Sequence, residues 1–342
     1  MRAAVLNEQK TFDIVEHPDP APGASDLVLR VEACGICGSD LKAAANMPVG
    51  LVMGHEFCGE IVAVGQEAAG SWKVGERVAS LPLIGCGTCL ACLKGDVVHC
   101  ARGADPIGVG GSSGAYAEYI KVGSCETFRL PESFGHGDGA LVEPLAVGLH
   151  AVDRAQLRRG DNVLIIGAGP VGMAVTLWAH HFGAREIIVS DPVAARRDQC
   201  GLLGATGGID PTKTGSVSNS FKRAVGSLAD VVFECVGVPG MVQAAIDGAE
   251  VHGKVVIVGV CSKPDPFVPV VALMKELTMH FVVYTAARTT GTPSTCCTPA
   301  VSTRFRWCPI GSLSMRSPRC SRRSSTRRHS ARCSFCRDRL GP

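Results

Sequence analysis

Apolar positions follow two different patterns along the chain. Residues 1–148 hold short apolar runs separated by Gly and Pro, such as Leu27–Val31 and Gly59–Gly65. Short runs with this punctuation predict β-strands joined by tight turns. The first 148 residues are therefore expected to form a β-rich domain.

The pattern changes at Asp161, where buried-type strands begin to alternate with helical stretches. This alternation predicts βαβ units and a parallel sheet in an α/β domain spanning residues 149–284. A helix is expected at Leu145–Arg159, ahead of Gly160, as the connection between the two domains. The expected strands are Val163–Ile166, Glu186–Ser190, Asp230–Glu234, Lys254–Val258 and Thr278–Tyr284.

Both patterns disappear in residues 285–342, which are rich in Ser, Thr, Arg, Cys and Pro. This segment has twelve arginines, no lysine and one acidic residue, a formal charge of +11, whereas residues 1–284 carry −8. Without a hydrophobic period it is expected to be disordered. We interpret it as an aberrant tail translated in a shifted reading frame. The alternative is an arginine-rich arm that binds nucleic acid or an acidic partner.

Composition limits the class of protein. The chain has 342 residues, 46% hydrophobic and 19% charged, which suits a soluble enzyme of two domains. Charged residues Arg2 and Glu8 interrupt the N-terminus too early for a signal peptide. The run Val163–Phe182 contains three glycines, a proline and two histidines, so no membrane span is expected. We predict a cytoplasmic protein whose seventeen cysteines are metal ligands or buried thiols.

A glycine-rich turn follows the first strand of the α/β domain. Its G-x-G-x-x-G spacing predicts a Rossmann dinucleotide site with a doubly wound parallel sheet. Asp191, nineteen residues after the last of these glycines, is placed to accept hydrogen bonds from a ribose and to repel a 2′-phosphate, which favours NAD over NADP. Arg196 and Arg197 could bind a phosphate but are better placed on a solvated helix face. The predicted cofactor-binding residues are Gly167, Gly169, Val171, Gly172 and Asp191.

Four cysteines occur within fifteen residues, with the spacing C-x2-C-x2-C-x7-C. Four thiolates can complete a tetrahedral zinc shell and leave no position for a substrate, so this loop predicts a structural zinc site. Ordinary buried thiols are the alternative interpretation. The four residues are Cys86, Cys89, Cys92 and Cys100.

A second set of metal-binding side chains is spread over three segments. Cys37, the neighbours His55 and Glu56, and Glu143 supply a thiolate, an imidazole and two carboxylates. Taken singly, His55 could be a core histidine and Glu143 a charge at a helix start. Together they are suited to a catalytic zinc, which needs three protein ligands and an exchangeable position.

These residues resemble the medium-chain zinc dehydrogenase family, which includes alcohol, sorbitol, threonine and butanediol dehydrogenases. The resemblance rests on the Cys37 segment, Gly54–Glu60, Gly75–Val78, the four-cysteine loop, Glu143–Val147 and the glycine fingerprint, in the expected order over residues 1 to about 284. It implies that the β-rich domain is GroES-like and that each chain holds two zinc ions. A dimer or tetramer is also implied.

The resemblance further implies roles for single residues. Cys37 and His55 would hold the catalytic zinc, with Glu143 as third ligand and Glu56 adjacent or exchanging with water. Ser39 would bridge the substrate hydroxyl to a proton relay, and Asp40 would orient His55. Many members have a histidine five residues after the catalytic cysteine, where this chain has Lys42. Lys42 is therefore either a catalytic relay or a solvated side chain.

The implied reaction transfers a hydride between NAD and a secondary alcohol, polyol or hydroxy amino acid. The altered tail raises the alternative of an impaired remnant that binds zinc and NAD without turnover. No membrane partner is expected, and nucleic acid is expected only if the tail is a binding arm.

Overall fold

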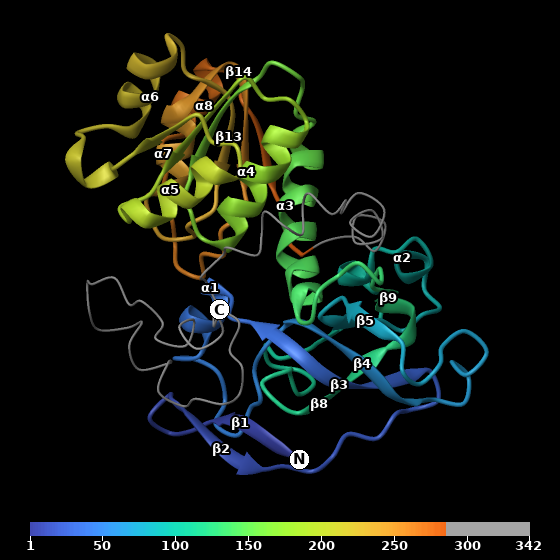
Figure 1. Ribbon diagram of the computed structural model, residues 1–342. Helices are drawn as coiled ribbons and strands as arrows, with labels where there is room; N and C mark the ends of the chain where they lie inside the picture. Colours follow the sequence, from blue (N-terminus) through green and yellow to red (C-terminus); the bar gives the residue numbers. More distant parts are fainter. Residues whose placement is uncertain (285–342) are drawn as a thin grey trace, which may run out of the picture.

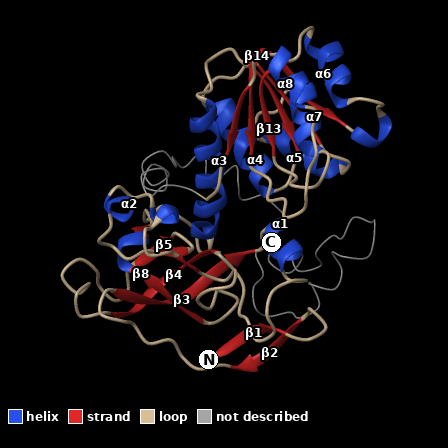
Figure 2. Cartoon of the chain, turned by 180° about the vertical axis from the view of Figure 1, so that it is seen from behind, coloured by secondary structure: helices blue, strands red, loops and turns tan. Residues whose placement is uncertain are grey.

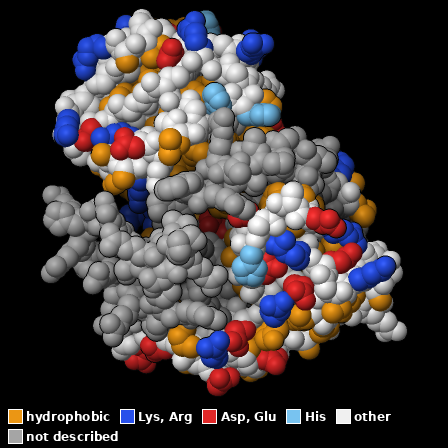
Figure 3. All heavy atoms as spheres, in the orientation of Figure 1, with side chains coloured by type: hydrophobic (Ala, Val, Ile, Leu, Met, Phe, Trp, Pro, Cys, Tyr) orange, Lys and Arg blue, Asp and Glu red, His pale blue; other side chains and the backbone are white. Residues whose placement is uncertain are grey.

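The computed structural model describes residues 1–284, which form two lobes joined by the helix α3, Val142–Ala155 (Figure 1). The aberrant tail predicted for residues 285–342, and with it both interpretations of that tail, lie outside the described residues. Within residues 1–284, no helix is long and apolar enough to cross a membrane. Acidic and basic side chains both appear on each lobe (Figure 3).

The N-terminal lobe is built on a five-stranded antiparallel sheet of order β8-β3-β4-β5-β9 (Figure 2). These strands are Tyr119–Gly123, Asp26–Gly35, Glu56–Val64, Arg77–Ser80 and Thr127–Arg129 in that order. Two small antiparallel pairs flank it, β1 (Arg2–Leu6) with β2 (Phe12–Glu16) and β6 (Leu83–Ile84) with β7 (Asp105–Pro106). The helical turns of this lobe are α1 (Gly38–Ala43), α2 (Leu90–Leu93), η1 (Val97–His99), η2 (Ser124–Glu126) and η3 (Asp138–Leu141).

The second lobe, which we call the parallel-sheet lobe, has six parallel strands in the order β12-β11-β10-β13-β14-β15. The strands are β10 (Asn162–Ile166), β11 (Glu186–Ser190), β12 (Gly207–Ile209), β13 (Ala229–Glu234), β14 (Ala249–Ile257) and β15 (Thr278–Phe281). The helical segments are α4 (Pro170–His181), α5 (Ala194–Leu202), η4 (Pro211–Lys213), α6 (Val217–Val225), α7 (Met241–Gly248) and α8 (Pro269–Met274). Numbered from β10, the order is 3-2-1-4-5-6, the Rossmann topology, as expected.

Side chains of β10 alternate between two cores because successive residues of a strand face opposite sides. Val163 and Ile165 pack in the cluster that contains Trp178 of α4, whereas Leu164 and Ile166 pack with Phe221 of α6. Helices therefore cover both faces of the sheet. This burial explains why the strand is apolar at nearly every position.

The predicted strands of the α/β domain are confirmed, with shifts at their ends. β14 begins five residues before the expected Lys254, and β12 was missed because Gly207 and Gly208 give it a weak strand pattern. The expected connecting helix begins and ends earlier than Leu145–Arg159. Pro144 suits a first helical turn, and the helix stops where Gln156 turns to the left-handed region at φ 48°.

Candidate functional site

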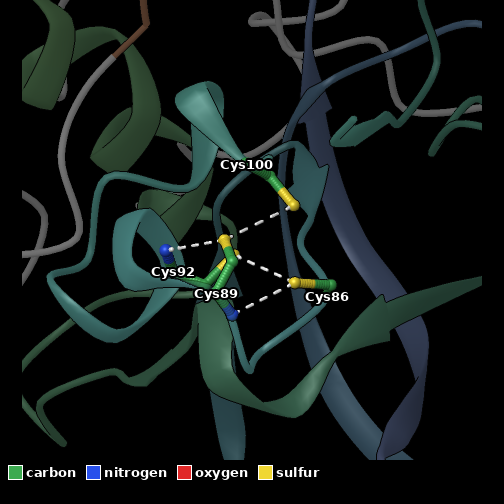
Figure 4. Close-up of side chains that lie close together, drawn as sticks. All are labelled: Cys86, Cys89, Cys92 and Cys100. Carbon is green, nitrogen blue, oxygen red and sulfur yellow. Dashed lines mark hydrogen bonds between the residues drawn. The ribbon is translucent and has the colours of Figure 1, made fainter. Parts of the chain in front are cut away.

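The four-cysteine cluster (Cys86, Cys89, Cys92 and Cys100) comes from one short stretch of chain beside α2. Figure 4 shows the four side chains directed toward a common centre. The Sγ atoms of Cys86 and Cys92 are 4.0 Å apart, and those of Cys89 and Cys100 are 3.9 Å apart. Four sulfurs at the usual zinc distance of about 2.3 Å would be separated by about 3.8 Å. The observed spacing therefore fits a closed tetrahedral zinc shell.

Backbone N–H groups donate hydrogen bonds to two of the four sulfurs. The N–H of Cys89 donates to Cys86 Sγ at 3.4 Å, and the N–H of Cys92 donates to Cys89 Sγ at 3.5 Å. Hydrogen bonds from Thr88 are the main cause that lowers the pKa of Cys86 to about 5, and those from Cys92 and Ala101 lower the pKa of Cys89. Burial instead raises the pKa of Cys92 to about 12. Lowered pKa values favour thiolate, the form that binds zinc.

A second group, the mixed cluster of Cys37, His55 and Glu56, forms where α1 meets the start of β4. Its three candidate ligand atoms lie within 4.8 Å of one another. Cys37 is the N-cap of α1, so its sulfur lies at a fixed helix end and accepts from the N–H of Ser39 at 3.5 Å. His55 and Glu56 are only 6% and 4% exposed. The fold therefore brings together Cys37 and the pair His55 and Glu56, which the sequence predicts as zinc ligands from separate segments.

Asp40 contacts His55 and Cys37 of the mixed cluster, and Tyr116 contacts Asp40. Asp40, 3% exposed, has Oδ1 at 3.0 Å from His55 Nδ1, although without the alignment of a hydrogen bond. Its Oδ2 accepts from the Tyr116 hydroxyl at 2.8 Å and from the N–H of Cys37 at 3.1 Å. With Nδ1 facing this carboxylate, Nε2 of His55 is the nitrogen left for a metal.

Glu143, at the start of α3, is close to the mixed cluster but outside its 4.8 Å grouping. It is 8% exposed, and burial raises its pKa to about 7. Burial, followed by repulsion from Glu143, raises the pKa of Glu56 to about 8. Several acidic groups thus share a buried region, and the charge of His55 opposes the rise in pKa of Cys37, Glu56 and Glu143.

The donor set of the mixed cluster fits zinc. Glu56 Oε1 is buried and has no hydrogen-bond partner among the described residues. Burial also raises the pKa of the Cys37 thiol, whose negative form would be unfavourable there without a cation. A thiolate, an imidazole and a carboxylate are the ligand types that zinc takes in catalytic sites, and a divalent cation would balance their charge.

The two residues predicted to carry protons differ in position. Ser39 lies in the first turn of α1, two residues from Cys37. Lys42 points away from the mixed cluster, and its Nζ donates to the backbone carbonyls of Val236, Gly237 and Val260 in the parallel-sheet lobe. Lys42 is exposed, as a solvated side chain would be, and these three carbonyls are its partners in the fold.

The glycine-rich turn connects β10 to α4. Gly167 has φ +99°, and a Cβ on Gly172 would lie 1.9 Å from the Gly167 carbonyl oxygen, so neither position accepts another residue without strain. A Cβ on Gly169 would meet nothing within 4 Å, which leaves open space beside the helix N-terminus. Val171 is half-buried against the core. The turn has the shape that a pyrophosphate requires.

Asp191 directly follows β11 and is 5% exposed. Its Oδ2 accepts from the N–H of Ala168 in the glycine turn at 2.9 Å, and its Oδ1 accepts from the N–H of Val193 at 2.8 Å. Arg196 lies 3.8 Å from the same carboxylate, and the Arg197 guanidinium donates to the Asp191 carbonyl. The Arg196 side chain is 46% exposed, in line with the expected solvated helix face, whereas Arg197 is largely buried between Asp191 and Asp210.

Tyr116 was missed by sequence reasoning because it lies sixty or more residues from its partners in the site. A signal was available at Gly54, whose φ is +101° and whose Cβ would lie 2.5 Å from the Tyr116 ring. A glycine directly before His55 therefore makes room for an aromatic side chain. The glycine alone does not identify which aromatic residue fills that space.

Comparison with known proteins agrees with this geometry. Residues 23–132 match the alcohol dehydrogenase GroES-like domain, and residues 170–293 match the zinc-binding dehydrogenase domain. Sorbitol dehydrogenase of Bacillus subtilis (strain 168) is 34% identical over 274 residues, 77% of this chain and 76% of that protein. (R,R)-butanediol dehydrogenase of the same organism is 32% identical over 307 residues, 83% of this chain and 84% of that protein.

The solved structure of galactitol-1-phosphate dehydrogenase from Escherichia coli has a TM-score of 0.78 at 29% identity, covering 86% of this chain and 89% of that chain. The two family matches fall on the two lobes described here. The chain belongs to the zinc-dependent medium-chain alcohol and polyol dehydrogenase family.

Proposed function

We propose that the chain catalyses NAD-linked oxidation of a secondary alcohol, polyol or hydroxy amino acid, and the reverse reduction. The buried mixed cluster carries this proposal, because Glu56 Oε1 lacks a partner among the described residues while a thiol and an imidazole lie within 4.8 Å. Cys37 and His55 would hold the zinc, with Glu143 as third ligand and Glu56 exchanging with water. Cys86, Cys89, Cys92 and Cys100 would hold a second, structural zinc.

When bound, zinc supplies Lewis-acid chemistry to the alcohol oxygen, and NAD accepts the hydride. The chain's own residues position and desolvate the reactants. Asp40, 3.0 Å from His55 Nδ1, would orient the His55 ring, and the near-complete burial of His55 and Glu56 excludes bulk water. Ser39, in the first turn of α1, would accept the hydroxyl proton and pass it to solvent through water.

The coenzyme would bind across the ends of β10 and β13, where the strand order reverses. The glycine turn would hold the pyrophosphate, and the negative charge of Asp191 favours NAD over NADP. Arg196, 3.8 Å from that carboxylate, is the group that would oppose this preference. Titration with both coenzymes decides it, since a tighter dissociation constant for NADP would overturn the NAD assignment.

We also propose a boundary near residues 148 and 149 between a zinc-binding domain and a coenzyme-binding domain, because α3 spans the two lobes there. A homodimer or homotetramer in the cytoplasm is proposed from the resemblance to the family. Sedimentation of the purified chain tests the assembly state.

The function is tested by measuring zinc per chain and NAD reduction with a panel of secondary alcohols, polyols and threonine at alkaline pH. Two zinc ions and turnover that a chelator removes and zinc restores would support the proposal. Two zinc ions with NAD binding but no turnover would point to the impaired remnant. Turnover that persists in a preparation free of zinc would overturn the zinc assignment.

A further inference from the structure

Lys42 connects the two lobes. It lies in the last turn of α1, the helix that both ribbon views show directly below the parallel-sheet lobe (Figures 1 and 2). Its Nζ donates to the carbonyl of Val236 at 2.6 Å, of Gly237 at 2.9 Å and of Val260 at 3.3 Å. An ammonium group has three donors, so these three acceptors satisfy it.

Internal hydrogen bonds fix the backbone of the loop after β13, which supplies two of the three acceptors. Glu234, the last residue of β13, is 1% exposed, and its Oε1 accepts from the N–H groups of Val236 at 2.7 Å and Gly237 at 2.8 Å. Because these N–H groups turn inward to the carboxylate, the carbonyls of the same loop are free to face Lys42.

The two loops also pack backbone to backbone. Gly237 has φ +64°, and a Cβ there would lie 2.5 Å from the carbonyl oxygen of Val260. The Glu234 carbonyl accepts from the N–H groups of Val258 and Gly259 at 2.9 Å. The three carbonyls therefore form a fixed acceptor set, which one cation can engage as a unit.

We propose that Lys42 is an interlobe clamp that holds the last turn of α1, the helix whose N-cap is Cys37, against the coenzyme-binding edge of the parallel sheet. Lys42 is then a positioning residue for NAD and not a proton relay. The inference rests on the proposed function, because the edge at β10 and β13 is where the coenzyme would bind. A relay would require Lys42 to lose a proton, and with it one of the three bonds to carbonyls.

Three variants separate a clamp from a relay. Lys42→Met removes the donors, whereas Lys42→Arg keeps a cation with several donors that does not deprotonate and so cannot relay protons. Lys254→Met is the matched control. Lys254 Nζ donates to the carbonyl of Gln156 at 3.1 Å and takes no part in the interlobe contact of Lys42. The measurements are the dissociation constant for NAD by titration, KM for NAD, kcat, and the pH profile of kcat.

For a clamp, Lys42→Met should weaken NAD binding about tenfold, since it removes hydrogen bonds to a charged group, and leave the apparent pKa of the kcat profile unchanged. Lys42→Arg should keep NAD affinity and turnover within about threefold, and Lys254→Met should match the parent. If both Lys42 variants bind NAD normally, lose turnover alike and change the pH profile, Lys42 is a relay and the clamp is wrong.

Hydrogen exchange on the chain without coenzyme tests the clamp separately from the proposed function. We expect about tenfold faster exchange across residues 235–261 in Lys42→Met but not in Lys254→Met. Unchanged exchange would overturn the clamp. A parent chain that binds neither zinc nor NAD, with exchange still faster in Lys42→Met, would overturn the proposed function and leave the clamp standing.

Discussion

The four-cysteine cluster and the mixed cluster are both metal-binding groups, but they are assembled differently. The ligands of the four-cysteine cluster lie within fifteen residues of one another in the sequence. Local backbone N–H groups align them, as when the N–H of Cys89 donates to Cys86 Sγ. The mixed cluster joins Cys37 to His55 and Glu56 and depends on Tyr116 for support. Its ligands are also more deeply buried, and carboxylates are among them.

This difference separates two kinds of site. The four-cysteine loop can organise its metal with short-range contacts and offers four sulfur ligands, which suits a structural ion. The mixed cluster can bind a metal only if two segments and their support are already packed. Substitutions far from the mixed cluster should therefore weaken its affinity for the metal. The metal affinity of the four-cysteine loop should fall only when residues of that loop are substituted.

The largest expected effect comes from Cys37→Ala. Loss of a ligand removes Lewis-acid assistance of several kcal/mol, so kcat/KM should fall about a thousandfold, with one zinc lost per chain and the other retained. Activity and zinc content are measured together, with Cys125→Ala, an exposed free cysteine, as the control. Turnover near the parent level in Cys37→Ala would remove the mixed cluster from the mechanism.

Cys92→Ser removes a ligand from the four-cysteine cluster and should affect stability more than activity. Without a complete thiolate shell the loop loses its zinc, and the free energy of unfolding of the N-terminal lobe should fall by several kcal/mol, which lowers Tm by about 10 °C. Chains that remain folded should keep the mixed-cluster zinc. Calorimetry and zinc analysis measure both effects, and an unaltered Tm would contradict a structural role.

A smaller effect is expected from Tyr116→Phe, which removes the hydroxyl bonded to Asp40 Oδ2. Loss of such an outer partner weakens metal binding about 10–100-fold, here for the mixed cluster alone. Tyr119→Phe, in β8, is the control. Competition with a chelator gives the affinities, and equal weakening at the four-cysteine cluster would show that the two sites are not independent.

The smallest effect concerns the ion pair that anchors the segment leading to Glu143. Arg77 donates to both carboxylate oxygens of Glu32, at 2.9 and 3.0 Å, and to the carbonyls of Phe134 and Gly135 at 2.9 Å. Burial alone would raise the pKa of Glu32, but the hydrogen bonds and charge of Arg77 outweigh it and hold that pKa below its ordinary value.

A lowered pKa in the folded state means that the Glu32 carboxylate stabilises the fold above its unfolded pKa of about 4.3 and loses this contribution as pH falls through the folded value. Glu32→Gln should therefore cost about 1–2 kcal/mol at pH 7, with the difference shrinking below about pH 4. Urea unfolding at several pH values measures it. Glu60→Gln, which breaks the exposed pair with Arg30, should cost less than about 1 kcal/mol, and an equal cost would refute the argument.

Local features of the molecule were readable from the sequence. The glycine spacing after β10, the period of the buried strands and the C-x2-C-x2-C-x7-C loop each depend on residues close in the chain. Strand ends were less accurate, because the start of β14 and the existence of β12 depend on pairing with neighbouring strands.

Long-range contacts were decided by the tertiary structure. The sequence supplied Cys37, His55 and Glu56 as candidates, but the folded chain brings them within 4.8 Å, leaves Glu143 outside that group and adds Tyr116. It also turns Lys42 toward carbonyls about 200 residues away. Spacing along a chain fixes which side chains share a turn, whereas the packing of whole elements fixes which distant side chains meet.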